Sequence, residues 1–405
     1  MPASACSMIP KSRASGRTSA RLWAILLTLA IGTAAAAPAP EPATREFHFA
    51  VLGDSQFHDP ATYNRIIDDL RHLSPAFVIQ VGDMIEGYRN NPAEIRAEWR
   101  RFLNQIAPLA PTAFLPVPGN HDLYNANRRA DKKLEDVYRE VWGEPYYAFD
   151  YLNATFIVLN SDAPDEEGRI GPDQWRWLAE TLERSNSEHV FAFMHRPPSS
   201  LKNADKLHRL LREHPVKYVF YGHHHHYHFS RKDGIGYVMT NAAADGGTPL
   251  DRAGNFDHLL QVTVRDSEVR FAVIRADAVE APDYVHPDDN NDLFALTRKF
   301  APDSTPLKSA SGGWRMTFPL RNPTDRALTV YVECGSTDER WQHQPRQIAP
   351  LTLGPQASTE LTMSWSQSTS RQSESDPYCD LRVPFQTAHG DWLEHRARVV
   401  GQQPN

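Results

Sequence analysis

The sequence lacks an excess of positive charge, since 43 lysine and arginine residues face 50 aspartate and glutamate residues and give a formal net charge of −7. Proteins that bind nucleic acid in general need a basic face, so this balance disfavours that class. Hydrophobic residues make up 40% and charged residues 23% of the 405 positions. This composition argues against a disordered chain and predicts a globular protein long enough for two domains.

The apolar run Leu22–Ile31 is too short to cross a bilayer, which requires roughly 20 residues. Basic residues between positions 11 and 21 precede the run, and the small residues Thr33–Pro40 follow it. This order predicts a signal peptide over residues 1–36, cut near Ala36, and a linker over residues 37–45. The protein is therefore expected to be exported, either periplasmic or secreted, with no transmembrane segment after cleavage. An uncleaved membrane anchor is the alternative.

Cysteine is scarce, with three residues in the whole chain. Cys6 lies in the predicted leader, which leaves Cys334 and Cys379 as a pair in the last quarter of the sequence. In an oxidising compartment an even pair predicts a disulfide, here a structural one remote from the histidine-rich segments. Two unrelated buried thiols are the alternative.

Residues 46–276 alternate short apolar runs with helical patterns, which predicts a layered α/β domain. We expect helices over Tyr63–His72, Ala93–Ile106, Asp131–Trp142 and Pro172–Ser185. The segment 277–305 is rich in proline and aspartate and reads as a linker. Residues 306–405 alternate polar and apolar positions between turns, which predicts a smaller all-β sandwich domain of the immunoglobulin-like type.

Five short motifs place chemically active side chains directly after apolar runs. They are GDSQ at Gly53–Gln56, GDMIE at Gly82–Glu86, GNHD at Gly119–Asp122, MHRPP at Met194–Pro198 and GHHHH at Gly222–His226. Polar ligands of α/β domains bind beyond the carboxyl ends of strands, where these motifs fall. Alternate residues face together in an extended turn, so His223 and His225 can meet a metal while His224 and His226 point elsewhere. Two carboxylates, an amide and three imidazoles suit a pair of divalent cations.

The five motifs, in this order, resemble those of the calcineurin-like metallophosphoesterase family over the first domain. The resemblance implies a four-layer fold in which a β-sandwich is flanked by helices. It also implies a dinuclear centre of Mn, Fe, Zn, Co or Mg. Asp54 and His225 would bind the first metal, Asn120, His195 and His223 would bind the second, and Asp83 would bridge both. His121 would protonate the leaving group and Asp122 would orient His121.

Two positions depart from the family pattern. Gln56 stands where the family has a metal-binding histidine, and we expect it to be a weaker ligand, with His58 as a possible substitute. Glu86 stands where aspartate is common. The residues Met84–Glu86 include no tyrosine, which disfavours the Fe³⁺–tyrosinate centre of purple acid phosphatases.

These features predict an exported hydrolase of phosphate mono- or diesters, acting on a small molecule or a phosphorylated substrate. A hydroxide shared by the two metals would attack phosphorus in line. Arg196, Tyr124 and Asn125 are candidate substrate-binding residues. The main alternative is a catalytically silent metal-binding protein whose β-sandwich binds a partner or a glycan, and a histidine-rich metal scavenger is a third. The sequence does not choose between monoester and diester substrates.

Overall fold

A computed structural model describes residues 45–403, apart from the segments 57–59, 242–250, 276–277, 311–312, 337–340, 346–347 and 368–375. The predicted signal peptide, its cleavage site near Ala36 and the candidate ligand His58 lie outside the described residues. Residues 44–405 form one compact unit. None of the helices in the described part of the chain has the length and apolarity needed to cross a membrane.

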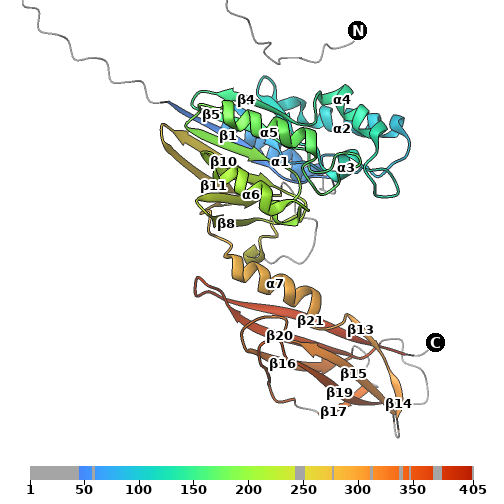
Figure 1. The fold of residues 1–405 in the computed structure, drawn as a ribbon. Helices are drawn as coiled ribbons and strands as arrows, with labels where there is room; N and C mark the ends of the chain where they lie inside the picture. The colour runs from blue at the N-terminus through green and yellow to red at the C-terminus, as the bar shows by residue number, and fades with distance from the viewer. Residues whose placement is uncertain are drawn as a thin grey trace, which may run out of the picture. The chain divides into compact units, whose positions relative to one another are not determined.

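Two six-stranded sheets form the centre of the first domain (Figure 1). The first sheet has the order β12-β11-β10-β1-β2-β3, and the second has the order β4-β5-β6-β7-β9-β8. The strands of the first sheet are β1 (Glu46–Leu52), β2 (Phe77–Gln80), β3 (Ala113–Pro116), β10 (Leu259–Arg265), β11 (Glu268–Ile274) and β12 (Val279–Glu280). Those of the second are β4 (Tyr147–Tyr151), β5 (Ala154–Val158), β6 (His189–Phe193), β7 (Val216–Tyr221), β8 (His228–Lys232) and β9 (Ile235–Met239).

Side-chain alternation along each strand fills two different cores. In β1, Phe49 and Val51 face the second sheet, whereas Ala50 and Leu52 face the helices on the other side. In β6, Phe191 and Phe193 likewise face the first sheet. Phenylalanine rings from both sheets pack between them, as Phe49 and Phe191 do edge to face with centroids 5.3 Å apart. Strands buried on both faces explain the continuous apolar runs in the sequence.

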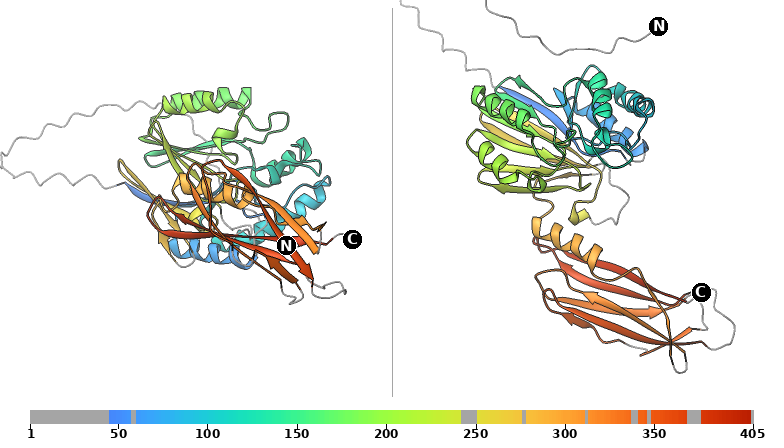
Figure 2. Two further views of the ribbon diagram at one scale, coloured as in Figure 1. Left: turned by 90° about the horizontal axis from the view of Figure 1, so that it is seen from below. Right: turned by 45° about the vertical axis from the view of Figure 1, so that its right-hand side comes forward.

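Helices cover the outer face of each sheet, so the domain has the predicted four layers (Figure 2). α1 (Pro60–Leu73), α2 (Pro92–Ile106) and α4 (Lys132–Trp142) pack on the first sheet, and α5 (Pro172–Arg184) and α6 (Ala204–Arg212) pack on the second. The four predicted helices are confirmed. The shorter helical segments are η1 (Ala107–Leu109), α3 (Asn120–Leu123), η2 (Pro198–Ser200) and η3 (Asp251–Ala253).

The C-terminal region is a strand-rich sandwich, as predicted. One sheet has the order β13-β21-β20-β16-β18 and the other has the order β14-β15-β19-β17. Cys334 of β16 lies opposite Cys379 of β20, and the two form a disulfide. The strands are β13 (Ser304–Pro306), β14 (Lys308–Ala310), β15 (Gly313–Arg321), β16 (Leu328–Gly335), β17 (Trp341–Gln344), β18 (Leu351–Leu353), β19 (Ser358–Gln367), β20 (Tyr378–Gln386) and β21 (Trp392–Gln402).

The segment 277–305, predicted as a linker, contains a 13-residue helix, α7 (Pro287–Lys299). Its proline and aspartates, which indicated a connector, are start signals of the helix: Pro287 is its first residue and Asp288 and Asp289 lie in its first turn. The His286 side chain accepts a hydrogen bond from the Asp288 N–H and caps the helix. Leu293 and Leu296 bury one face of α7 in the core of the C-terminal sandwich.

Candidate metal centre and active site

The motif residues meet at one edge of the two central sheets. In the first sheet, Asp54 follows β1, Asp83 follows β2 and Asn120 follows β3. In the second sheet, His195 follows β6, and both His223 and His225 follow β7. Because β1, β2 and β3 run parallel, as do β6 and β7, each sheet presents its strand ends on one side. The structure therefore brings the six predicted metal-binding side chains together at this edge.

These side chains form two ligand groups that share Asp83. One group is Asp83, His195 and His223, and the other is Asp54, Asp83 and His225; within each, the ligand atoms lie within 4.8 Å of one another. His195 Nε2 is 3.1 Å from Asp83 Oδ2, and His225 Nε2 is 3.3 Å from Asp54 Oδ2. The predicted bridging position of Asp83 matches this geometry.

Two amide side chains complete the groups. Asn120 Oδ1 lies 3.0 Å from His195 Nε2, so it joins the second group. Gln56 Nε2 lies 3.4 Å from Asp83 Oδ2 and 2.9 Å from His225 Nε2, so Gln56 joins the first. The amide nitrogen of Gln56 faces the ligands, and a half-turn of the amide would present its oxygen. The ligand role of Gln56 stays a prediction.

The backbone is shaped for this close approach. A Cβ atom at Gly222 would lie 2.0 Å from Asp54 Oδ1, and one at Gly119 would lie 2.2 Å from Asp83 Oδ1. Three ligands themselves have positive φ angles, 51° at Asp83, 77° at His223 and 54° at His225. Such conformations are costly for residues other than glycine and cluster at functional sites.

The electrostatics of the site suit a cation. Burial alone would lower the pKa of His195, but the carboxylates of Asp83 and Asp54 raise it to about 10. Burial and the positive charges of His195 and Arg196 lower the pKa of His223 to about 2. A proton on His195 therefore compensates the buried carboxylates. The donor set, with oxygen and imidazole ligands around shared carboxylates, fits two divalent ions that would replace this proton.

His121 lies beside the ligand groups, held by the loop after β2. Its Nδ1 lies 2.5 Å from the backbone oxygen of Glu86, which as an acceptor requires a proton on Nδ1. Its backbone N–H donates to Asp83 Oδ1 at 2.8 Å. A transferable proton on this ring would therefore sit on Nε2.

The carboxylate of Asp122 accepts backbone N–H groups of Asp83, Met84 and Gly119, at 2.9, 3.0 and 2.8 Å. It thereby holds the GDMIE and GNHD loops together. The sequence prediction was that Asp122 orients the His121 ring, whereas here the Glu86 carbonyl contacts the ring and Asp122 fixes the loops around it.

Arg196 is held toward the centre by residues of the second sheet. Its Nε donates to Asp162 Oδ1 at 2.6 Å, and its Nη1 lies 3.1 Å from His223 Nε2. Tyr124 donates to the same Asp162 oxygen at 2.9 Å and accepts from Arg196 Nη2 at 3.2 Å. The side chain of Asn125, by contrast, donates a hydrogen bond to Asp131 and accepts one from the N–H of Asn127. It thus stabilises the turn in which it lies.

The sequence reasoning missed Asp162 and Tyr88. Asp162 ends the apolar run of β5 with the same strand-then-aspartate pattern as Asp54 and Asp83, and that signal was available. The hydroxyl of Tyr88 accepts a hydrogen bond from Asn120 Nδ2 at 2.7 Å, and its ring lies 4.2 Å from that of His121. No local pattern marks Tyr88, because its contact depends on the fold.

Comparison with known proteins gives matches that each cover part of the chain. The profile of the calcineurin-like phosphoesterase family matches residues 47–227. The serine/threonine-protein phosphatase CPPED1 of Homo sapiens, and that of Pongo abelii, is 28% identical over 131 residues, 30% of this chain. The match spans 40% of the length of these relatives. A dimetal phosphatase structure from Danio rerio aligns with a TM-score of 0.45 and 16% identity, covering 58% of this chain and 98% of that one.

Proposed function

We propose that this chain is a metal-dependent hydrolase of phosphate mono- or diesters, because its residues 47–227 match the profile of the calcineurin-like phosphoesterase family. The observation that carries this proposal is the pair of ligand groups that share Asp83, with His121 directly beside them. Two divalent ions bound there would activate water and neutralise charge on the phosphoryl oxygens. The CPPED1 relatives are named as serine/threonine-protein phosphatases, which act on phosphate monoesters.

Each neighbouring residue has a distinct proposed role. Asn120, His195 and His223 hold one ion, and Asp54, His225 and Gln56 hold the other, with Asp83 between them. His121 donates a proton from Nε2 to the leaving oxygen, because its Nδ1 proton is held by the Glu86 carbonyl. Arg196, fixed by Asp162, binds a phosphoryl oxygen and favours the charge that builds on it.

Metal-dependent turnover tests the proposal. Purified protein would be stripped of metal and reloaded with Mn²⁺, Zn²⁺, Mg²⁺, Co²⁺ or Fe²⁺, then assayed with p-nitrophenyl phosphate and bis-p-nitrophenyl phosphate. We expect turnover with at least one ion, lost in Asp83→Ala and retained in Asp173→Ala, which removes an exposed carboxylate of α5. Tight binding of two ions without any turnover would instead identify a silent metal-binding protein.

We also propose that the protein is exported. The basic, apolar and small-residue order of positions 11–40 supports this, as does the disulfide between Cys334 and Cys379. Expression of the full chain in a bacterium, followed by fractionation and mass spectrometry of the N-terminus, tests it. We expect a periplasmic or secreted product that begins near residue 37, and a cytoplasmic product with an intact leader contradicts export.

A further inference from the structure

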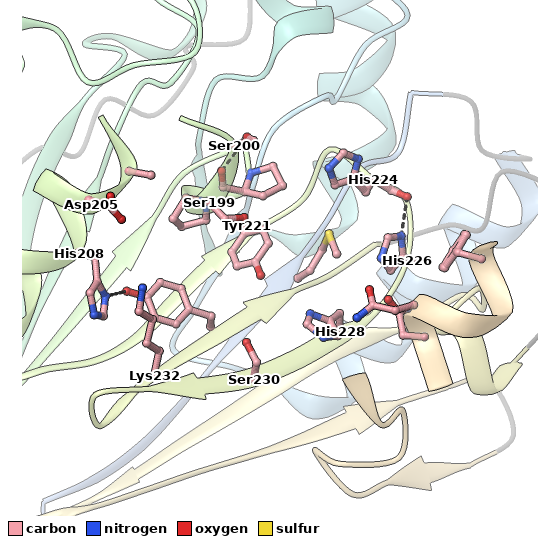
Figure 3. A pocket seen from close by; sticks show the side chains of 18 of the residues that line it. Ser199, Ser200, Asp205, His208, Tyr221, His224, His226, His228, Ser230 and Lys232 are labelled. Atoms are coloured by element: carbon pink, nitrogen blue, oxygen red, sulfur yellow. Dashed lines mark hydrogen bonds between the residues drawn. The ribbon is translucent and has the colours of Figure 1, made fainter. Parts of the chain in front are cut away.

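A cavity of about 710 Å³ lies between the second sheet and the helices α6 and α7 (Figure 3). One wall comes from η2 and α6, with Ser199 and Asp205. A second comes from the strands and turn of β7–β9, with His224 and Lys232. The third comes from α7, the helix in the segment that the sequence indicated as a linker.

The cavity shares backbone with the metal centre. His224 lines the cavity, and its two sequence neighbours are the predicted ligands His223 and His225. Pro197 also lines it and directly follows Arg196, whose guanidinium contacts His223. The cavity therefore adjoins the two loops that carry these predicted ligands and Arg196.

α7 presents one polar and aromatic face to the cavity. Asn290, Phe294 and Arg298 are spaced four residues apart and Asn291 lies three residues before Phe294, which places these side chains on one side of the helix. The ring of Phe294 packs 4.5 Å from that of His226, and the Arg298 guanidinium lies 5.4 Å from the Phe294 ring. The opposite faces of α7 thus serve two purposes, since Leu293 and Leu296 are buried in the C-terminal sandwich.

The lining mixes flat rings with many hydrogen-bonding groups. The hydroxyl groups of Ser199 and Ser230, the Asn291 amide and the His224 ring can bond hydroxyls of a ligand. Phe294 offers a face for ring C–H groups. Pro197, Pro198 and Met239 add apolar surface beside these polar groups, as the carbon skeleton of a ring requires. A volume of about 710 Å³ falls in the range of roughly 300–1,000 Å³ that small-molecule sites occupy.

We propose that this cavity binds the alcohol half of the substrate and that this half is a hydroxylated ring, the chemistry that sugar phosphates and nucleotides share. The proposal rests on the proposed function, because it assigns the leaving group of the same reaction. Phe294 packs against the ring, and Asn291 and Arg298 bond its hydroxyl groups. The ligand reaches the ions past His224.

Binding of phosphate-free ring alcohols tests the site without any turnover. Metal-loaded full-length protein would be titrated with D-glucose and with adenosine, and with glycerol as the acyclic control, by calorimetry or ligand-observed NMR. We expect at least one ring alcohol to bind more tightly than glycerol. Phe294→Ala should weaken that binding about tenfold, equivalent to roughly 1.4 kcal/mol, and Arg298→Ala should also weaken it.

Lys299→Ala is the matched control, because Lys299 is an exposed cation on the same helix that does not line the cavity. Arg298 is exposed as well, so its variant keeps the test valid if Phe294→Ala does not fold. Tighter binding of D-glucose would indicate a sugar phosphate as the source of the ring, and tighter binding of adenosine would indicate a nucleotide. The proposal is overturned if the ring alcohols and glycerol bind equally, or if the Arg298 and Lys299 variants bind the ring alcohol with equal affinity. It is also overturned if the protein clearly prefers a phosphopeptide. Ring binding without hydrolysis of any phosphate ester leaves the cavity assignment standing and refutes the proposed function.

Discussion

At the residue scale, the proposed proton transfer to the leaving alcohol depends on His121. We expect His121→Ala to retain its metal content, since the ring is outside both ligand groups. Its turnover should fall by about 10²–10⁴ for phenyl phosphate and by much less for p-nitrophenyl phosphate, whose leaving group needs no proton. Steady-state rates for the two substrates measure this difference. An equal loss for both would exclude the general-acid role.

Tyr88 determines which way the Asn120 amide points. The Tyr88 hydroxyl accepts from Asn120 Nδ2, and this leaves Oδ1 directed at the second ligand group. Tyr88→Phe removes that acceptor, and we expect roughly tenfold weaker binding of one metal ion. Loss of a hydrogen-bond partner that orients a metal ligand usually has an effect of this size. Competition with a chelator measures the affinity. Tyr151→Phe, at a half-exposed position of β4, is the control, and identical affinities in the two variants would refute the role.

Metal binding should depend on pH through His195. In the metal-free protein its pKa is raised to about 10, after the carboxylates outweigh burial, so the ring carries a proton at pH 7 to 8. An ion must displace that proton, and affinity should therefore rise with pH up to about 10. Calorimetry in buffers of different ionisation enthalpy should detect about one proton released at this ligand group. His195→Asn should release none, and the absence of release from the wild type would contradict the assignment.

The raised pKa of His195 also makes the stability of the metal-free protein depend on pH. The folded-state pKa of His195 lies above the unfolded value of about 6.5. Its protonation therefore stabilises the fold fully below pH of about 6.5, and this contribution is lost as pH rises toward 10.

At the element scale, the disulfide ties β16 to β20 across a sequence separation of 45 residues. Replacing Cys334 and Cys379 by serine should lower the free energy of unfolding of the C-terminal sandwich by about 2–4 kcal/mol, because the unfolded chain gains freedom. Hydrogen exchange in β16 and β20 measures this loss. Metal content should stay unchanged, since both cysteines lie outside the ligand groups. Unchanged exchange would show that the disulfide adds no stability.

Elements with a strong local signal were predictable from the sequence, and α7 was not. The helix α2 begins at Pro92, is capped by Asn91 and buries Trp99, so periodicity and start signals agree. In α7 the buried face contacts the C-terminal domain, while the other face carries asparagine, phenylalanine and arginine. A search for helices with one apolar face against one core therefore interprets the segment 277–305 as a connector.

At the scale of the whole molecule, the sequence predicted the four layers and the six candidate metal ligands that the structure brings together. These residues follow apolar strands and need only the strand order to meet. Asp162 carried the same strand-then-aspartate signal and was overlooked, whereas the position of Tyr88 required the fold, because it acts through a contact with another loop. The cavity required it most of all, since its walls come from segments as far apart in sequence as Ser199 and Arg298.

The sharing of ligands between the two sheets also bears on how the chain acquires its metals. Both carboxylate oxygens of Asp54, after β1, accept the backbone N–H of His223, after β7 and 169 residues later. Contacts of such sequence separation form late in folding, because a long chain segment must first be ordered. An early intermediate with one assembled sheet would hold only half of the ligands. Metal capture should therefore mark the final step of folding, and an ion added during refolding should slow unfolding far more than it speeds the collapse of the chain.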